Sequence, residues 1–315
     1  MIQPHMSRAR HPLPTDLVAL ITHDGRVFPN EAKTWDRMGS SDGGPHPLGT
    51  ALEQWFSFAT GKHTWVSVRG ATIRGLISAR RRAKRSAWEV DCLINADEDY
   101  SVTRSLLERM LAGVAKQKAE RVFLRLATGS ALAEIARGAG FFPYAQETLY
   151  RADEPAPTED PGLPFRPGSK ADAFGVYQLY NAVTPANVRA IEGTTFREWQ
   201  ASREPWGGTP DDWVLEEGGI ITGWLRLLRA NESRFSILVH PNRRDVDAFL
   251  QTALARLRGS RSVVCLAPSH GDSLSRQLRG LAFRPVEDYT AMAKRLAKHA
   301  EELSAETRGA AVTAT

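Results

Sequence analysis

The sequence predicts an α/β (α+β) protein that consists of two tandem copies of one domain. Five residues of the first half recur in the second half, each 148 positions later: Trp65, Val66, Gly70, Ile73 and Gly75 match Trp213, Val214, Gly218, Ile221 and Gly223. Each copy would span about 140 residues, which suits one domain and is too long for a solenoid repeat. The 315 residues are 42% hydrophobic, which is enough for two cores of ordinary size.

Composition predicts where the copies begin and end. A Pro-rich, acidic stretch over 151–163 reads as a semi-stiff linker between a first copy at 15–150 and a second copy at 164–298. The ends of the chain, 1–14 and 299–315, are polar or rich in Ala, Thr and Glu, so we expect disordered tails there.

The elements of the first copy follow from periodicity and turn residues. A hairpin over 17–28, a loop over 30–48 and a short helix over 50–58 come first. The later elements are strands at 64–68, 72–79 and 88–94, a helix at 101–118, a strand at 121–126, a short helix at 131–136 and a strand at 141–150.

The second copy repeats this order. It opens with a helix over 172–180 and another that starts at Thr184-Pro185 and runs toward Gln200, with Pro in its first turn. Strands at 212–215, 220–228 and 234–239, a helix at 245–257, a strand at 262–266, a short helix at 273–278 and a strand around 283 that 289–296 extends complete the copy.

Charge and cysteine content limit the class of partner. A net charge of +5 is compatible with an anionic ligand such as a phosphorylated cofactor. Because no run of about 18 apolar residues occurs and the start lacks an apolar signal core, we expect no membrane contact and a cytoplasmic location. Cys92 and Cys265 fall on apolar strands, one in each copy, so we expect buried free thiols and no metal site.

The order of helices, three antiparallel strands, helix, strand, helix and strand resembles the GCN5-related N-acetyltransferase (GNAT) fold over about 15–150 and 163–298. The Gly70–Gly75 and Gly218–Gly223 hairpins, His240-Pro241 with the Leu-rich helix after it, and the Gly140-Phe141 and Ala282-Phe283 ends carry the resemblance. It implies two tandem GNAT-like domains, each with a mixed, mostly antiparallel sheet flanked by helices. The fourth and fifth strands would splay apart to admit acyl-CoA.

The resemblance implies that acyl-CoA, with acetyl-CoA as the expected donor, is held by the second copy. Pantetheine would pair with the fourth strand at Leu238 and Val239, and the pyrophosphate would lie at the start of the next helix. The loop there places Arg243, Arg244, Val246 and Ala248 at or beside the family's Arg/Gln-x-x-Gly-x-Gly/Ala pattern, although Val246 replaces the first Gly. Arg243 and Arg244 either pair with phosphate or are solvated loop charges.

The matching loop of the first copy, 95–103, has no Gly and three carboxylates, which oppose two phosphates. Asp99 or Ser101 in that loop suits a helix N-cap.

The family's reaction transfers an acyl group to an amine that a carboxylate deprotonates. Glu89 and Asp91 share one face of the fourth strand of the first copy. They are candidates for the base, or they belong to a solvated face of the strand. In the second copy His240 is the candidate base, or it caps or packs at the strand end. The position where the family keeps a proton-donating Tyr holds Ala136 and Leu278.

Two further features have two interpretations each. The basic run Arg80–Arg85 is a nucleic-acid contact or a solvated hairpin tip, and the second is favoured because a second basic patch is missing. Four residues of the second copy either line an acceptor pocket or pack in the core: Trp199, Trp206, Trp213 and Trp224.

We therefore expect an N-acyltransferase that acts on an unidentified amine of a small molecule or peptide. An inactive relative that binds a small molecule or a partner is the alternative.

Overall fold

The computed structural model of the chain describes residues 8–13, 29–38, 62–69, 72–95, 99–156 and 158–297. The hairpin predicted over 17–28, the helix predicted over 50–58, Gly70 and the tail 299–315 lie outside these residues. None of the helices in the described ranges combines the length and apolar character that a membrane span needs.

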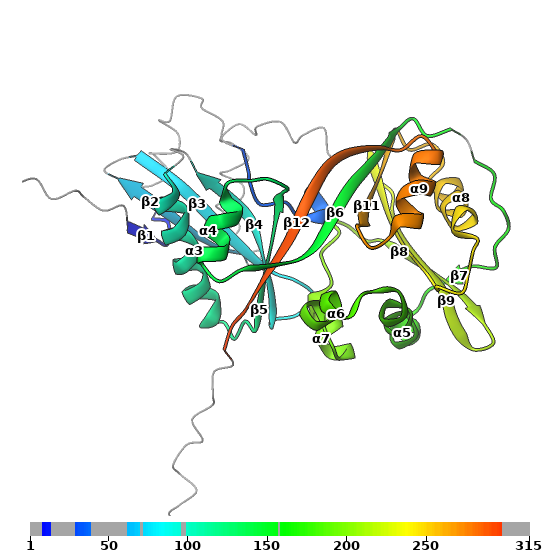
Figure 1. Cartoon of the computed structure of the whole chain (residues 1–315), viewed down its shortest axis with the longest axis horizontal. Coiled ribbons are helices and arrows are strands. Elements are labelled where there is room, and N and C mark those ends of the chain that lie inside the picture. Colours follow the sequence, from blue (N-terminus) through cyan, green and yellow to red (C-terminus); the bar gives the residue numbers. More distant parts are fainter. Residues whose placement is uncertain are drawn as a thin grey trace, which may run out of the picture.

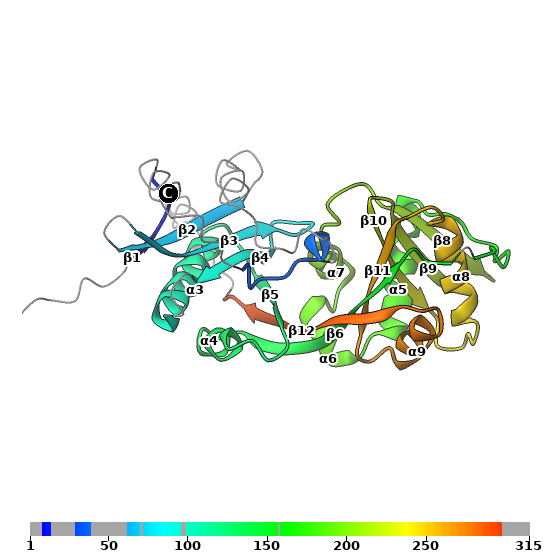
Figure 2. The ribbon, with the colours of Figure 1, turned by 90° about the horizontal axis from the view of Figure 1, so that it is seen from above.

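In the first half of the chain, one long helix and one short helix pack against a sheet (Figures 1 and 2). Its elements are β1 (Arg8–Arg10), a 3-10 helix (Trp35–Arg37), β2 (Lys62–Arg69), β3 (Thr72–Arg81), β4 (Ala87–Asn95), α3 (Tyr100–Ala115), β5 (Arg121–Ala127), α4 (Leu132–Gly138) and β6 (Phe142–Asp153).

The second half repeats the order and has three α-helices before its first long strand. Its elements are β7 (Arg166–Pro167), a 3-10 helix (Lys170–Asp172), α5 (Ala173–Val183), α6 (Ala186–Glu192), α7 (Phe196–Ser202), β8 (Asp211–Glu217), β9 (Ile220–Leu228), β10 (Glu232–Val239), α8 (Val246–Arg256), β11 (Ser262–Pro268), α9 (Asp272–Gly280) and β12 (Arg284–Arg295).

The described strands form one mixed, mostly antiparallel sheet in the order β1-β2-β3-β4-β5-β12-β6-β11-β10-β9-β8-β7. The two halves exchange their last strands at its centre. β12 pairs with β5, where Tyr289 faces Ala127, and β6 pairs with β11, where Glu147 faces Pro268. Figure 1 shows β6 and β12 side by side between the two halves. Through this exchange, a strand of each copy completes the sheet of the other.

The repeat seen in the sequence corresponds to matching geometry. The β2–β3 pair has a bulge between Ser67 and Val68, and the β8–β9 pair has one between Leu215 and Glu216, at the same offset of 148. The predicted α/β fold class, with two tandem copies of mixed sheet and helices, is confirmed.

The surroundings of residues 75 and 223 explain why the repeat has Gly at both positions. A Cβ on Gly75 would lie 3.0 Å from a Leu106 methyl of α3, and one on Gly223 would lie 2.3 Å from the Phe249 ring of α8. Each Gly therefore lets the long helix of its own copy pack directly on the sheet.

One helix prediction was wrong. The helix expected from Thr184-Pro185 toward Gln200 is two short helices, α6 and α7, because Gly193 interrupts it at a φ of 155°. α7 then restarts on a capping box between Thr195 and Glu198. The break places Glu192 at the end of α6, beside the cavity described below.

Candidate functional site

In both copies, the two parallel strands next to the sheet centre pair briefly and then separate. β4 pairs with β5 only from Ala87 to Glu89, and β10 pairs with β11 only from Glu232 to Phe235. The splayed strands that the resemblance implied are thus present twice. The contents of the two openings differ.

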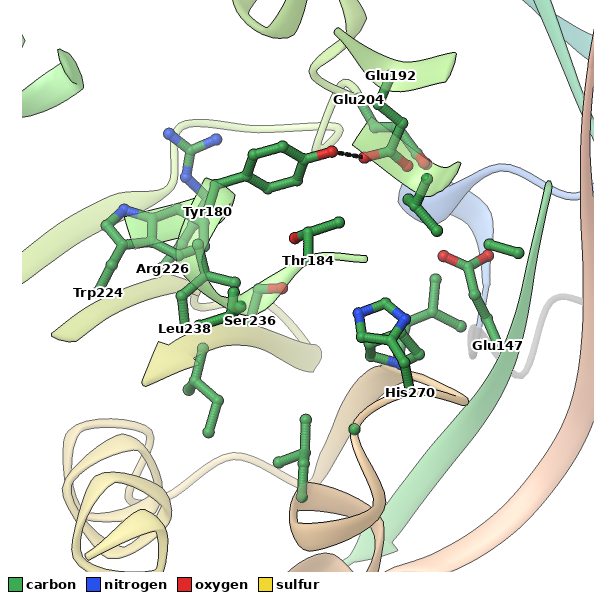
Figure 3. A pocket seen from close by; sticks show the side chains of 18 of the residues that line it. Glu147, Tyr180, Thr184, Glu192, Glu204, Trp224, Arg226, Ser236, Leu238 and His270 are labelled. Carbon is green, nitrogen blue, oxygen red and sulfur yellow. Dashed lines mark hydrogen bonds between the residues drawn. The ribbon is translucent and has the colours of Figure 1, made fainter. Parts of the chain in front are cut away.

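The opening of the second copy is a cavity of ≈ 510 Å³ (Figure 3). Ser236, Leu238 and Val239 of β10 line it on one side, and Leu266 and Pro268 of β11 line it on the other. The helices α5 to α7 and the segment after them close it, with Tyr180, Glu192, Arg203 and Glu204 among the lining residues.

Tyr180 and Glu192 meet at the wall of this cavity (Figure 3). The Tyr180 hydroxyl donates to one Glu192 carboxyl oxygen at 2.8 Å, and the Tyr144 hydroxyl donates to the other at 3.3 Å. Glu192 forms no ion pair with any residue in the described part of the chain. Burial raises the pKa of Glu192, so this carboxyl has more affinity for a proton than a solvated glutamate.

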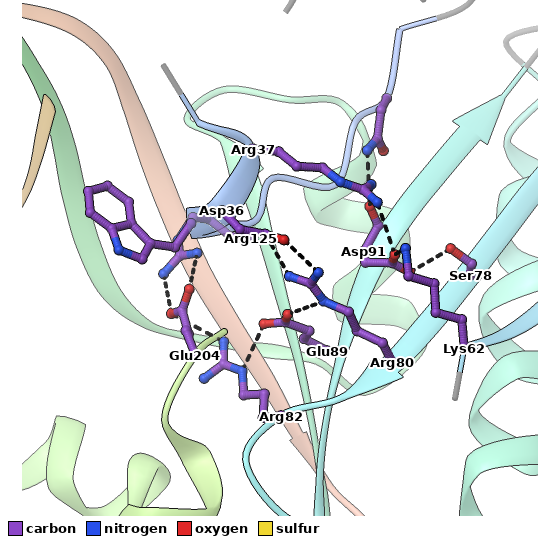
Figure 4. Close-up of polar contacts among 12 residues, drawn as sticks. Asp36, Arg37, Lys62, Ser78, Arg80, Arg82, Glu89, Asp91, Arg125 and Glu204 are labelled. Atoms are coloured by element: carbon purple, nitrogen blue, oxygen red, sulfur yellow. Dashed lines mark hydrogen bonds and ion pairs between the residues drawn. The ribbon is translucent and has the colours of Figure 1, made fainter. Parts of the chain in front are cut away.

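The first copy supplies part of the same cavity through the strand exchange. Glu147 of β6 lines it, as do Arg82 and Arg125. Arg125 binds Glu147 and Glu204, each at 2.6 Å, and Arg82 lies 3.3 Å from Glu204 (Figure 4). Burial alone would raise the pKa of Glu204, but Arg125 and Arg82 lower it to about 2, so Glu204 is held as an anion.

The opening of the first copy is filled by the chain itself. The segment Asn30–Met38 runs between the separated strands. The Glu31 N–H donates to the Leu93 carbonyl of β4, and the Lys33 N–H donates to the Arg125 carbonyl of β5, both at 2.9 Å. The Asn30 side chain accepts from the Leu93 N–H at 2.9 Å. The part of the loop predicted over 30–48 that is described therefore occupies the place where pantetheine would pair.

Glu89 and Asp91, predicted as candidate bases, lie on the first copy in a buried ion network (Figure 4). Glu89 binds Arg80 at 2.6 Å and Arg82 at 3.0 Å. Asp91 accepts from the Ser78 hydroxyl at 2.5 Å and from Lys62 at 3.0 Å. Neither carboxylate lines the cavity of the second copy.

The residues predicted to hold the cofactor divide into two groups. Leu238, Val239 and Val246 line the cavity, whereas Arg243, Arg244 and Ala248 do not. Arg243 binds Glu217 and Asp245, each at 2.5 Å. The Asp245 side chain makes no capping bond to α8, so the first N–H groups of that helix are left to other partners.

His240, the third candidate base, lies in the turn before α8. Its backbone N–H donates to the Thr222 carbonyl at 2.9 Å, and its ring accepts from the Asn242 N–H at 3.3 Å. It does not line the cavity, and neither do Ala136 and Leu278, which occupy the family's Tyr position.

The structure shows where the basic run and the tryptophans lie, and Trp199 and Trp206 are both buried in apolar clusters and exposed to the cavity. Arg80 and Arg82 face inward into the ion network, so a fully solvated hairpin tip was wrong for these two, whereas Lys84 and Arg85 are exposed. Three of the four tryptophans line the cavity: Trp199, Trp206 and Trp224. Cys92 and Cys265 are buried free thiols, as predicted.

Sequence reasoning missed Tyr180, Glu192, Arg203 and Glu204, which come from the segment before β8. The signal in the sequence is the polar and aromatic composition of the 177–206 region, which differs from the apolar spacing of an ordinary packed helix.

Two solved structures are similar over nearly the whole chain. A GCN5-related N-acetyltransferase from Sphaerobacter thermophilus matches with a TM-score of 0.58 and 16% identity, covering 93% of this chain and 97% of that one. A Pyrococcus horikoshii protein described as an acetyltransferase matches with a TM-score of 0.52 and 12% identity, covering 95% and 92%. No protein-family model and no curated protein matches the sequence. At these identities the similarity establishes the fold: the chain has the GNAT fold, in two tandem copies.

Proposed function

We propose that the second copy binds an acyl-CoA in the opening between β10 and β11 and transfers its acyl group to an amine. One observation carries this proposal: the opening of the second copy is a cavity, whereas the opening of the first copy is filled by Asn30–Met38. Acetyl-CoA is the proposed donor.

The residues around the opening suit such a ligand. Past Phe235 the β10 backbone has no partner on β11, so its edge at Leu238 and Val239 is available to the amides of pantetheine. The start of α8 would attract the pyrophosphate through its N–H groups, and Arg243 neutralises Asp245 and Glu217 beside it. A bound acyl-CoA would supply the activated thioester, and residues of the chain would bind it and accept the proton of the amine.

Glu192 is the proposed base. Its carboxyl faces the cavity, forms no ion pair within the described ranges, and has a pKa raised by burial, so it would accept the proton that the attacking amine loses. Glu204 and Glu147 are tied to Arg125 and are less suited to this role. Glu192→Gln should lower the rate of transfer by about 100-fold or more.

Binding is tested by thermal unfolding of the full chain with and without acetyl-CoA. A ligand at about 100 times its dissociation constant adds roughly 2.7 kcal/mol of stability. Ser236→Phe should fill the cavity and abolish the shift, and Asn231→Phe, in the exposed β9–β10 turn, is the matched control that should retain it. No shift of the wild-type chain at millimolar acetyl-CoA rejects the proposal.

Turnover is tested by release of free CoA thiol in the presence of a panel of primary amines. Release above the uncatalysed rate supports the transferase. Binding of acetyl-CoA without release by any amine supports the alternative, an inactive relative that binds a ligand.

A further inference from the structure

Arg203 differs from the other arginines that line the cavity. Arg82, Arg125 and Arg226 each bind carboxylates of the chain; Arg226, for example, binds Asp212 at 2.8 and 2.6 Å. The Arg203 guanidinium makes no hydrogen bond and no ion pair with the described residues, although it lines the same cavity.

The surroundings of Arg203 hold its guanidinium in place. Its backbone carbonyl accepts from the Ala83 N–H at 3.3 Å, which fixes the main chain against the first copy. Its guanidinium lies over the Trp199 ring at 5.2 Å and the Trp224 ring at 5.9 Å. Figure 3 shows Trp224 and Arg226 together on one side of the cavity, away from Glu147 and His270.

These aromatic contacts do not compensate for the charge of Arg203. A cation–π contact contributes about 0.5–2 kcal/mol and leaves the five N–H donors of a guanidinium without acceptors. Burial, and then the nearby Arg226, lower the pKa of Arg203 to about 10, so its positive charge is destabilised where it stands. Such a charge is typical of a site where a ligand supplies the opposite charge.

We propose that Arg203 binds a carboxylate that a substrate carries into the cavity. The guanidinium fork matches a carboxylate in a bidentate contact, and the two Trp rings present it to the cavity. This inference rests on the proposed function. The carboxylate belongs either to the acceptor, as in an amino acid whose ammonium faces Glu192, or to the acyl group, as in a dicarboxylic acyl-CoA.

Calorimetry on the full chain separates the two sources. The first arm compares succinyl-CoA with acetyl-CoA. The second arm, with coenzyme A present, compares each common amino acid with its own carboxamide. We expect one arm to show a preference of about tenfold or more for the carboxylate form. Arg203→Gln should remove this preference and leave acetyl-CoA affinity within about twofold, because this variant retains the β10 edge and the start of α8.

Two further variants keep the test decisive. Arg203→Lys retains the charge without the planar fork and should keep part of the preference, and Arg229→Gln, an exposed arginine of the same copy, should keep all of it. If the wild-type chain binds acetyl-CoA but prefers no carboxylate in either arm, the inference is wrong. If Arg203→Gln weakens acetyl-CoA itself tenfold, the residue binds a CoA phosphate instead. Failure of the wild-type chain to bind acetyl-CoA would reject the proposed function separately.

Discussion

The two copies separate the same pair of strands and use the opening in different ways. In the first copy Asn30–Met38 crosses from β4 to β5 and satisfies backbone groups on both. In the second copy the same place is a cavity walled by α5 to α7 and by residues of the first copy. A duplicated scaffold thus has one opening closed by its own chain and one opening that the closed copy helps to build.

Arg125 contacts both openings, and its replacement is the prediction with the largest expected effect. Arg125 lies on β5, where its carbonyl holds Asn30–Met38, and its guanidinium holds Glu147 and Glu204 at the cavity. Arg125→Gln leaves two carboxylates without this cation and should reduce the free energy of unfolding by about 3–5 kcal/mol, measured by denaturant titration. A loss below about 1 kcal/mol would show that the two openings do not depend on this residue.

Glu192 gives the second prediction, on the open copy alone. Because its pKa is raised, the folded state holds its proton more tightly than the unfolded state. The stabilisation is fully present below the ordinary pKa of 4.5 and is lost as pH rises through the folded pKa. The stability of Glu192→Gln relative to wild type should therefore rise between pH 4 and pH 8.

The transfer rate of Glu192→Gln should be about 100-fold lower than that of the wild-type chain. It should also lack the fall at low pH that protonation of Glu192 causes in the wild-type chain. A constant difference in melting temperature across this pH range, or an unchanged pH–rate profile, would contradict the role given to Glu192.

Asn30 gives the third prediction, on the closed copy. Asn30→Ala leaves the N–H of the fully buried Leu93 without its acceptor and should reduce the free energy of unfolding by about 1–3 kcal/mol. Acetyl-CoA affinity should stay unchanged, because Asn30 itself does not line the cavity. Asn231→Ala is the exposed control. A large change in affinity would mean that Asn30 acts on the cavity through the rest of its segment, which contributes Trp35 to the lining.

Arg203 gives the smallest effect and the most direct contrast with Arg125. Because its charge has no carboxylate partner in the described ranges, Arg203→Gln should cost no stability and should gain up to about 1 kcal/mol. The measurement is the same denaturant titration. A loss of 2 kcal/mol or more would mean that the guanidinium supports the fold.

Much of the fold follows from the sequence, because Gly75 and Gly223, the tryptophans before them and the helix spacings are local patterns. The exchange of β6 and β12 does not, since both strands follow a similar turn at Phe141 and Phe283 and either could pair with either copy. Their partners depend on contacts between residues 109 to 121 positions apart for β6 with β11 and 162 to 174 positions apart for β12 with β5, for which sequence periodicity has no signal.

The candidate site was predictable only in part. The splayed strands and the lining by Leu238 and Val239 agree with the resemblance. The filling of the first opening comes from Asn30–Met38, part of a stretch for which the sequence predicts only a loop, and Glu192 reaches the cavity because Gly193 ends α6. Arg80 and Arg82 belong to a charge run that is typical of a solvated turn, yet alternation along β3 directs Arg80 inward, and Arg82, directly after the strand, binds the same Glu89.

The stoichiometry of acetyl-CoA binding, measured by calorimetry on the full chain, tests the central claim most directly. We predict one molecule per chain, bound by the second copy and lost in Ser236→Phe. Two molecules per chain, or one that persists in Ser236→Phe, would contradict the assignment of an open and a closed copy.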